Sequence, residues 1–289
     1  MSDAERMKIR PLAQEDIAGA MRLKEGVGWN QTEDDWRRLL RLGPRRCFAA
    51  TVGERLVGTT TTTSYGKDLA WVGMVLVDSE FRRRGIATAL VRAALDGLEA
   101  DGVSAVKLDA TPEGAPVYGG LGFEAESRIE RWVGAAGARS SGSVTPGDAV
   151  PPELLGRVFE LDRRAFGADR SELIKALAGE ACVAPALRVG VGGRLQGYAL
   201  ARRGSRATYV GPVVAEGVEA ASSVLDDVLG RLGAGQVYVD LDTTFEGGVL
   251  ELAARGFTKQ RDLVRMRRGG RAGAGTSRTV FAIAGPEVG

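Results

Sequence analysis

An internal repeat constrains the fold of this chain more than any other feature of its sequence. Four short segments recur in the same order in the second half: Val52–Gly58 as Val191–Gly197, Trp71–Gly73 as Tyr209–Gly211, Leu108–Asp109 as Leu241–Asp242, and Gly122–Phe123 as Gly256–Phe257. The offset between the copies drifts from 139 to 133 residues. Chance could produce any one of these weak matches, but four in one order predict a duplicated fold unit. The 289 residues of the chain suffice for two domains of about 130–150 residues each.

Composition predicts where the two domains meet. Residues 134–152 are mostly Gly, Ala, Ser and Pro, which predicts a linker between domains over residues 1–133 and 153–289. In both halves, strand-like and helix-like segments follow one another, which predicts an α/β fold. Thr59–Thr63 reads as a strand with one solvent-facing side, and Thr279–Ala284 as a final edge strand.

The chain contains no histidine. Its absence excludes histidine-containing metal sites, Ser-His-Asp and Cys-His nucleophiles, and an imidazole general base. Asp226 and Asp227 have no partner at ligand spacing and read as a solvated helix face, so we expect no metal site. The formal net charge is only +2, which argues against a dedicated nucleic-acid-binding protein.

The remaining composition favours a cytoplasmic protein. Cys47 and Cys182 are the two cysteines, and two reduced thiols are favoured over a disulfide. The polar segment Met1–Arg10 does not resemble a signal peptide. No run of apolar residues approaches the length of a membrane span, so we expect no membrane partner.

A turn rich in arginine and glycine carries the clearest functional signal. It joins the apolar strand Trp71–Val77 to a predicted helix over Ile86–Ala100. The first amides of a helix lack intrahelical partners, and the helix dipole makes that end positive. Arg82, Arg83 and Arg84 add positive charge, while Gly85 and Ala87 leave the backbone accessible. These features predict a pyrophosphate site; a plain turn with solvated arginines is the alternative.

The spacing Arg82-x-x-Gly85-x-Ala87 resembles the Arg/Gln-x-x-Gly-x-Gly/Ala loop of the GNAT acetyltransferase superfamily. Tyr118-x-x-x-Gly122-Phe123 and the opening Ile9–Leu12 with Asp16 also match this family, so the resemblance covers about residues 7–133. The P-loop and Rossmann glycine patterns are both absent. The whole chain resembles a tandem GNAT protein whose second domain is degenerate. This resemblance implies two domains, each a twisted mixed β-sheet flanked by helices.

The resemblance also implies acetyl-CoA as acyl donor, bound in the first domain. The pantetheine arm is expected along the strand residues Val75, Leu76 and Val77, in a gap beside the strand Ala105–Asp109. The pyrophosphate is expected on Arg82, Arg83, Arg84, Gly85, Ile86, Ala87 and Thr88. Tyr118 matches the tyrosine that protonates the departing thiolate, although a buried aromatic with a packing role is the alternative.

The general base and the acceptor are less defined by the sequence. Many GNAT proteins place a glutamate on the central strand, but Trp71–Val77 contains no carboxylate. Asp109, Glu113 or a water held by backbone carbonyls remain as bases, and Asp109 could instead cap the turn before Pro112. Candidate acceptor-binding residues are Trp29, Asn30, Tyr65 and Trp71, each of which has core packing as an alternative role.

The second half lacks the parts that acyl-CoA chemistry needs. Its segment Val214–Glu219 carries two acidic residues in place of the arginine turn, and Leu252 stands at the position that matches Tyr118. We therefore expect an N-acetyltransferase that acts on a small-molecule or peptide amine through its first domain alone. A non-catalytic acyl-CoA sensor is the main alternative, and a protein that binds another nucleotide through the arginine turn is a further one.

Overall fold

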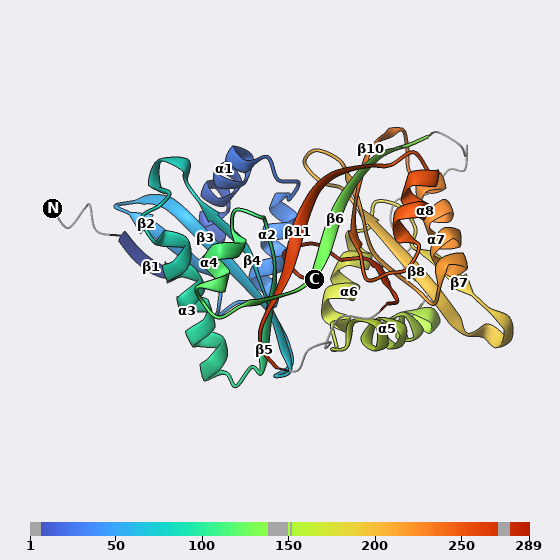
Figure 1. The fold of residues 1–289 in the computed structure, drawn as a ribbon, viewed down its shortest axis with the longest axis horizontal. Coiled ribbons are helices and arrows are strands. Elements are labelled where there is room, and N and C mark those ends of the chain that lie inside the picture. Colours follow the sequence, from blue (N-terminus) through green and yellow to red (C-terminus); the bar gives the residue numbers. More distant parts are fainter. Residues whose placement is uncertain (1–6, 138–149, 151, 271–277) are drawn as a thin grey trace. The chain divides into compact units, whose positions relative to one another are not determined.

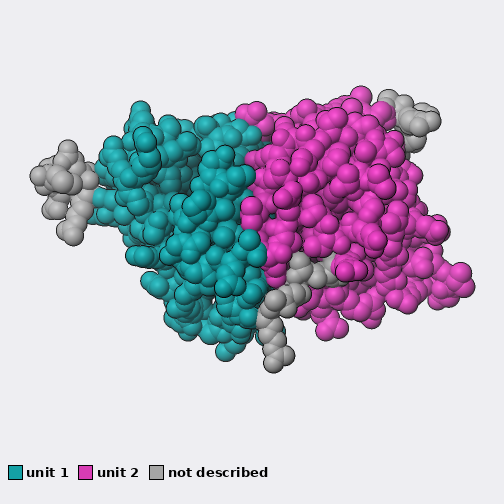
Figure 2. All heavy atoms as spheres, in the orientation of Figure 1, with its two compact units in different colours: residues 1–125, 266–270, 288 teal, residues 126–265, 271–287, 289 magenta. Residues whose placement is uncertain are grey.

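The structure is a computed structural model that describes residues 7–137, 150, 152–270 and 278–289. The chain divides into two compact units, shown in teal and magenta in Figure 2. Unit 1 holds the described residues of 1–125, 266–270 and 288, and unit 2 those of 126–265, 271–287 and 289. Each unit therefore contains residues from both halves of the sequence.

Unit 1 is a mixed sheet with helices, in the strand order β1-β2-β3-β4-β5. Its strands and helices are labelled in Figure 1: β1 (Met7–Pro11), α1 (Ile17–Val27), α2 (Glu33–Leu42), β2 (Phe48–Val52), β3 (Arg55–Tyr65), β4 (Leu69–Val77), α3 (Ile86–Ala100), β5 (Ala105–Ala110) and α4 (Ala115–Gly119). Helix α2 begins at Thr32, which exchanges hydrogen bonds with Asp35 in a capping box. Ile86 and Leu90 of α3 pack on Ala50 and Val57 of the sheet.

Strand β4 bends away from β5 after a short stretch of pairing. Parallel pairing joins Ala70 to Val106 and Trp71 to Lys107, and then it stops. Three residues after Trp71, Met74 adopts a left-handed backbone conformation (φ +48°), and the register between β3 and β4 shifts at this bulge. The Thr59 hydroxyl donates to the Met74 carbonyl at 2.8 Å. The C-terminal half of β4 is thereby separated from β5.

Unit 2 repeats this arrangement of strands and helices. Its elements are α5 (Pro152–Phe166), α6 (Ser171–Gly179), β7 (Ala186–Val189), β8 (Leu195–Arg202), β9 (Thr208–Ala215), α7 (Val218–Arg231), β10 (Gly235–Asp242), α8 (Gly248–Ala254), β11 (Thr258–Gly269) and β12 (Val280–Ala282). The succession β3, β4, α3, β5, α4 recurs as β8, β9, α7, β10, α8, which confirms the duplication. Strands β10 and β9 also pair in parallel at two positions, Val237–Thr208 and Tyr238–Tyr209.

The two copies exchange their last long strands. Strand β6 (Glu124–Ala136) follows the first copy in sequence, yet from Glu126 onward it belongs to unit 2, where it pairs antiparallel with β10. Conversely, the final residues of β11, from Met266, belong to unit 1, where β11 is the neighbour of β5. Strand β6 continues through Ala136, into the predicted linker; residues 138–149 and 151 of that linker lie outside the described residues.

The prediction of a final edge strand is wrong. Strand β12 forms within the predicted range, but it lies between β9 and β10, inside the sheet of unit 2. It pairs antiparallel with both neighbours. Strand β12 has a neighbouring strand on each side. The hydrophobic pattern of three to five residues does not distinguish such a strand from one at the edge of a sheet, which explains the error.

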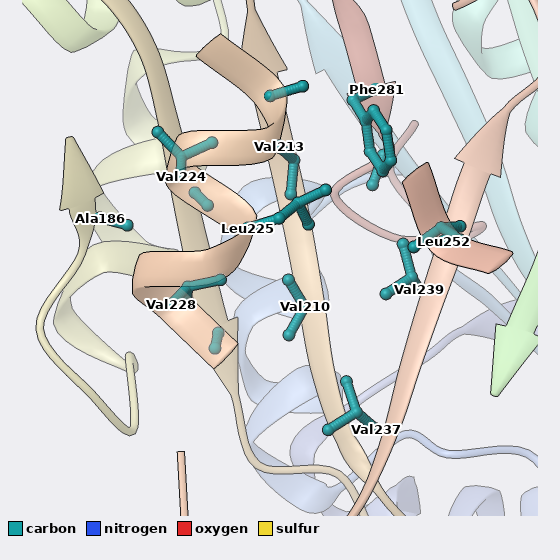
Figure 3. Packing of buried hydrophobic residues seen from close by; sticks show 14 of the residues in the cluster. Ala186, Val210, Val213, Val224, Leu225, Val228, Val237, Val239, Leu252 and Phe281 are labelled. Carbon is teal, nitrogen blue, oxygen red and sulfur yellow. The ribbon is translucent and has the colours of Figure 1, made fainter. Parts of the chain in front are cut away.

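The core of unit 2 is a large cluster of aliphatic and aromatic side chains around β9, β10 and α7, drawn in Figure 3. Val213, Val224, Leu225, Val239 and Phe281 are among its fully buried members. No helix of the described residues is both long and apolar enough to cross a membrane.

Candidate functional site

The turn between β4 and α3 leaves the start of a long helix without a side-chain cap. Gly85 is the N-cap of α3 and has a left-handed backbone (φ +78°), and no side chain caps this end. The first intrahelical bond runs from the Ala89 amide to the Gly85 carbonyl at 3.0 Å. The amides that precede Ala89 in the helix therefore face outward as free donors. A Cβ placed on Gly85 would meet no atom within 4 Å, so the space beside these amides is open.

The three arginines of the turn have different surroundings. Arg82 donates to the Val77 carbonyl at 3.3 Å, and Arg84 donates to the Glu80 carbonyl at 3.1 Å and stacks over the Phe81 ring at 5.0 Å. Arg83 is exposed and has a left-handed backbone (φ +61°). Arg82 has an extended backbone, whereas Arg83 and Gly85 are left-handed. The three arginine charges and the start of α3 make this turn positively charged, which suits an anion.

Asp78 anchors this turn, and sequence reasoning missed it. Its carboxylate accepts hydrogen bonds from Arg22 at 2.8 Å, Arg55 at 2.9 Å and the Glu80 amide at 3.2 Å. Burial raises the pKa of Asp78, but the bonds from Arg22, the Glu80 amide and Arg55 outweigh it and hold the pKa below its usual value. An aspartate directly after a buried strand and before Ser79 is the sequence signal that could have found it.

Tyr118 lies on the short helix α4 and is partly accessible. Its ring packs edge-on against Phe123, with the ring centroids 6.2 Å apart. Burial is the one cause that shifts the pKa of Tyr118, and it raises that pKa to about 12. The phenol therefore stays protonated throughout the neutral and moderately alkaline range, as a proton donor must.

The carboxylates considered as general bases lie at the end of β5 and beyond it. Asp109 is half-buried on β5, two residues after the fully buried Lys107, and Glu113 is exposed in the following turn. Because successive strand residues alternate between faces, Asp109 and Lys107 share one face of β5. Strand β4 carries no carboxylate along its whole length.

The residues predicted to bind the acceptor are mostly buried. Asn30 is buried in the connection between α1 and α2, whereas Trp29 is half-buried there. Trp71 is fully buried in β4. The Tyr65 hydroxyl, at the end of β3, donates to the Val288 carbonyl at 2.6 Å, so Tyr65 already has a protein partner.

Polar residues lie on both sides of Trp71 in the sheet. Trp71 is in register with Thr63 on β3 and with Lys107 on β5. Thr61 lies on the same face as Thr63, and the hydroxyls of both are buried without a hydrogen-bond partner in the described structure. The predicted solvent-facing side of Thr59–Thr63 is therefore wrong, because all five threonines are buried.

The corresponding turn of unit 2 has the opposite electrostatic character. Gly217 is the N-cap of α7, and the residue before it, Glu216, pairs with Arg194 at 2.6 Å. Leu252, at the position that matches Tyr118, is fully buried in the core of unit 2. No three side chains of His, Cys, Asp or Glu gather as a metal site among the residues that the structure describes.

Comparison with protein families agrees with both units. Residues 15–123 match the family described as "Acetyltransferase (GNAT) family", and residues 158–282 match that described as "Acetyltransferase (GNAT) domain". The chain contains two GNAT acetyltransferase domains in tandem. The arginine turn and Tyr118 both lie within the first GNAT domain, and β12 lies within the second.

Individual relatives are similar over most of the chain. An uncharacterized N-acetyltransferase of Bacillus subtilis, YitH, is 28% identical over 233 residues, which are 78% of this chain and 77% of that protein. A crystal structure from Pyrococcus horikoshii, of a protein assigned to the acetyltransferases, has a TM-score of 0.77 at 23% identity and covers 98% of this chain and 96% of that one. A tandem GNAT protein from the clavulanic acid biosynthesis pathway has a TM-score of 0.62 at 17% identity, with 92% and 99% covered. Both structures share the fold of this chain.

Proposed function

We propose that the protein is an N-acetyltransferase that transfers the acetyl group of acetyl-CoA to a primary amine, with acyl-CoA bound by the first GNAT domain. The observation that carries the proposal is the uncapped start of α3, because its free amides, the arginines and the open space at Gly85 fit a diphosphate. The separation of β4 from β5 beside this turn leaves backbone groups of Val75 and Val77 free of β5, where an extended pantetheine arm could pair with them.

The proposed reaction is a direct attack of the amine nitrogen on the thioester carbonyl carbon. The C–N bond forms, the C–S bond breaks, the nitrogen loses one proton and the thiolate gains one. At pH 7 only about one alkyl amine in a thousand is neutral, a deficit of about 4 kcal/mol. Asp109, or a water held by backbone carbonyls, would remove the proton from the amine.

Tyr118 would supply the proton to the departing thiolate. A free thiol has a pKa near 8.5, so proton transfer from a phenol of pKa about 12 runs uphill unless the thiolate is desolvated too. Burial in this protein has that effect on a thiol, since it raises the pKa of Cys47 to about 11. A thiolate placed beside Tyr118 in a similarly dry environment would accept its proton at little cost.

The second GNAT domain is proposed not to bind acyl-CoA. Glu216 places a carboxylate where the first domain has arginines. Leu252 stands at the position of Tyr118, the proposed proton donor of the first domain. This gives one acyl-CoA for each chain.

An amine-dependent assay tests the proposal. Free thiol release from acetyl-CoA is followed with a panel of amines that includes polyamines, amino acids, peptides and aminoglycosides. We expect at least one amine to raise thiol release well above the rate of hydrolysis.

A non-catalytic acyl-CoA sensor is the second candidate, favoured by the lack of a carboxylate on β4. It predicts saturable acetyl-CoA binding with no amine-dependent release. Binding of ADP as tight as that of acetyl-CoA would favour a protein that recognises another nucleotide.

A further inference from the structure

The second GNAT domain has a groove between two parallel strands, and a segment of the same chain fills it. Strands β9 and β10 pair near their starts and then diverge, as β4 and β5 do in unit 1. In unit 2 the space between the diverging strands contains β12. We refer to residues 279–284 as the insert strand.

The insert strand satisfies the backbone groups of both walls. Val280 and Ala282 pair with Val214 and Val213 of β9, and Ala282 is also in register with Leu241 of β10. The Ala215 amide donates to the Thr279 carbonyl at 2.9 Å, and the Ile283 amide donates to the Asp240 carbonyl at 3.0 Å. Without the insert strand, these donors and acceptors would lose their partners, which destabilises buried backbone groups.

An aromatic side chain of the insert strand packs beside α8. Phe281 is fully buried and packs edge-on against Phe245, with centroids 5.1 Å apart. A Cβ on Gly248 of α8 would lie 3.5 Å from the Phe281 ring. Figure 3 shows Phe281 near Leu252, the residue at the position of Tyr118 in the first copy. The insert strand thus fills both the gap between β9 and β10 and the space toward α8, which is the counterpart in unit 2 of helix α4.

Side chains from β8 and β9 hold the end of the insert strand. Arg202 donates to the Ala284 carbonyl at 2.9 Å and pairs with Glu287 at 3.2 Å. The Tyr209 hydroxyl donates to the Ile283 carbonyl at 3.0 Å. The Arg202 guanidinium also stacks over the Tyr209 ring at 4.3 Å. Both holding residues are buried, so this is a built site for a main chain rather than a surface contact.

We propose that the second GNAT domain is a strand-binding domain, whose groove takes an extended peptide in place of an acyl-CoA arm and is filled in cis by the insert strand. The comparison with an acyl-CoA arm rests on the function proposed above for unit 1. The proposal of a groove is supported independently by the pairing of the insert strand with β9 and β10, by the packing of Phe281, and by the hydrogen bonds that Arg202 and Tyr209 donate. The insert strand therefore excludes acyl-CoA from unit 2 and keeps the sheet of that unit closed.

Hydrogen exchange on the full-length protein tests this proposal. We expect the amides of residues 280–283 to exchange at least about 100-fold more slowly than in an unstructured peptide, at a rate like that of β9 and β10. Millimolar coenzyme A should leave this protection unchanged and slow exchange at residues 83–89. Loss of protection at 280–283 on adding coenzyme A, or rapid exchange there without it, would overturn the strand-binding proposal. No change at 83–89 would count against the proposed function alone.

A glycine substitution in the groove wall gives a second test. A Cβ at Gly211 would lie 2.2 Å from the Ile283 carbonyl oxygen, so Gly211→Ala must push the insert strand aside. Gly230→Ala is the matched control, because a Cβ there meets no atom within 4 Å. We expect Gly211→Ala to speed exchange at 280–283 at least tenfold and Gly230→Ala to leave it unchanged. Equal rates of amide exchange at residues 280–283 in the two variants would refute the proposal that the insert strand fills a groove. If Gly211→Ala does not fold, the exchange experiment on the wild-type protein with and without coenzyme A decides whether the proposal holds.

Discussion

Replacing Tyr118 with phenylalanine separates a chemical role of this residue from a packing role. Burial is the cause that raises the pKa of its hydroxyl, and within the described residues Tyr118→Phe therefore removes no ion pair that stabilises the fold. Tyr118→Phe keeps the ring that packs on Phe123. We therefore expect the free energy of unfolding to change by less than about 0.5 kcal/mol. A residue that only packs would show no further effect.

The expected kinetic effect is large by comparison. Loss of a positioned general acid lowers the rate about 10²- to 10⁴-fold, which corresponds to about 3–5 kcal/mol at 1.36 kcal/mol for each factor of ten. Amine-dependent thiol release, measured as kcat with saturating acetyl-CoA, reports this loss. The KM for acetyl-CoA should change little, because the proposed contact forms as the thiolate departs.

Two further observations control this experiment. Tyr238→Phe is the control variant. Tyr238 is buried in unit 2, and its ring lies under the Arg131 guanidinium. Removal of its hydroxyl should leave kcat unchanged. Because the pKa of Tyr118 is about 12, the wild-type rate should not fall on the alkaline side before about pH 11. A kcat within threefold of wild type in Tyr118→Phe would refute the assignment of Tyr118 as the acid.

Three other substitutions test the loop and the core. Gly85→Ala should destabilise the protein by about 1–2 kcal/mol, because Gly85 has a left-handed backbone (φ +78°). The same substitution should weaken coenzyme A binding, measured by calorimetry, at least tenfold. Gly26→Ala is the control, because the space around Gly26 is open, and it should change neither stability nor binding. Asp78→Asn should lower stability to urea above about pH 5, and this difference should shrink as pH falls through the depressed pKa of Asp78; a difference independent of pH from 2 to 7 would contradict the ion pairs. Arg170→Met, which leaves the buried Asp162 carboxylate without the bonds at 2.8 and 2.9 Å, should cost about 3–5 kcal/mol in urea unfolding, and a loss below 1 kcal/mol would refute a buried ion pair there.

Local signals in the sequence predicted the helices and strands of each copy closely. Helix α3 occupies the range Ile86–Ala100 that was expected for it. Gly85 before this helix and sustained hydrophobic periodicity within it explain the agreement, because both signals act within one element.

Features that depend on distant parts of the chain could not be predicted. The local pattern of a strand does not specify which strand it pairs with. The sequence therefore could not predict the exchange of β6 and β11, or the position of β12 between β9 and β10. The bulge at Met74, which separates β4 from β5, is a left-handed residue in an otherwise ordinary apolar strand. A methionine gives no sign of that conformation.

The candidate site divides along the same line. The turn Arg82–Thr88 could be singled out from the sequence because its proposed function depends on backbone amides at the start of one helix. Its anchor at Asp78 binds Arg22 and Arg55 across 56 and 23 residues of sequence, so neither pair has a local signal. The hydrogen bond from Tyr65 to Val288 spans 223 residues and was equally inaccessible to sequence reasoning.

Calorimetric titration of the full-length protein with coenzyme A tests the central claim most directly. If the start of α3 binds the diphosphate and the insert strand fills unit 2, the titration should saturate at one coenzyme A for each chain. Coenzyme A at 100 times its Kd should then stabilise the folded protein by about 2.7 kcal/mol. The absence of heat and of any thermal shift at millimolar coenzyme A, or saturation at two for each chain, would contradict this account.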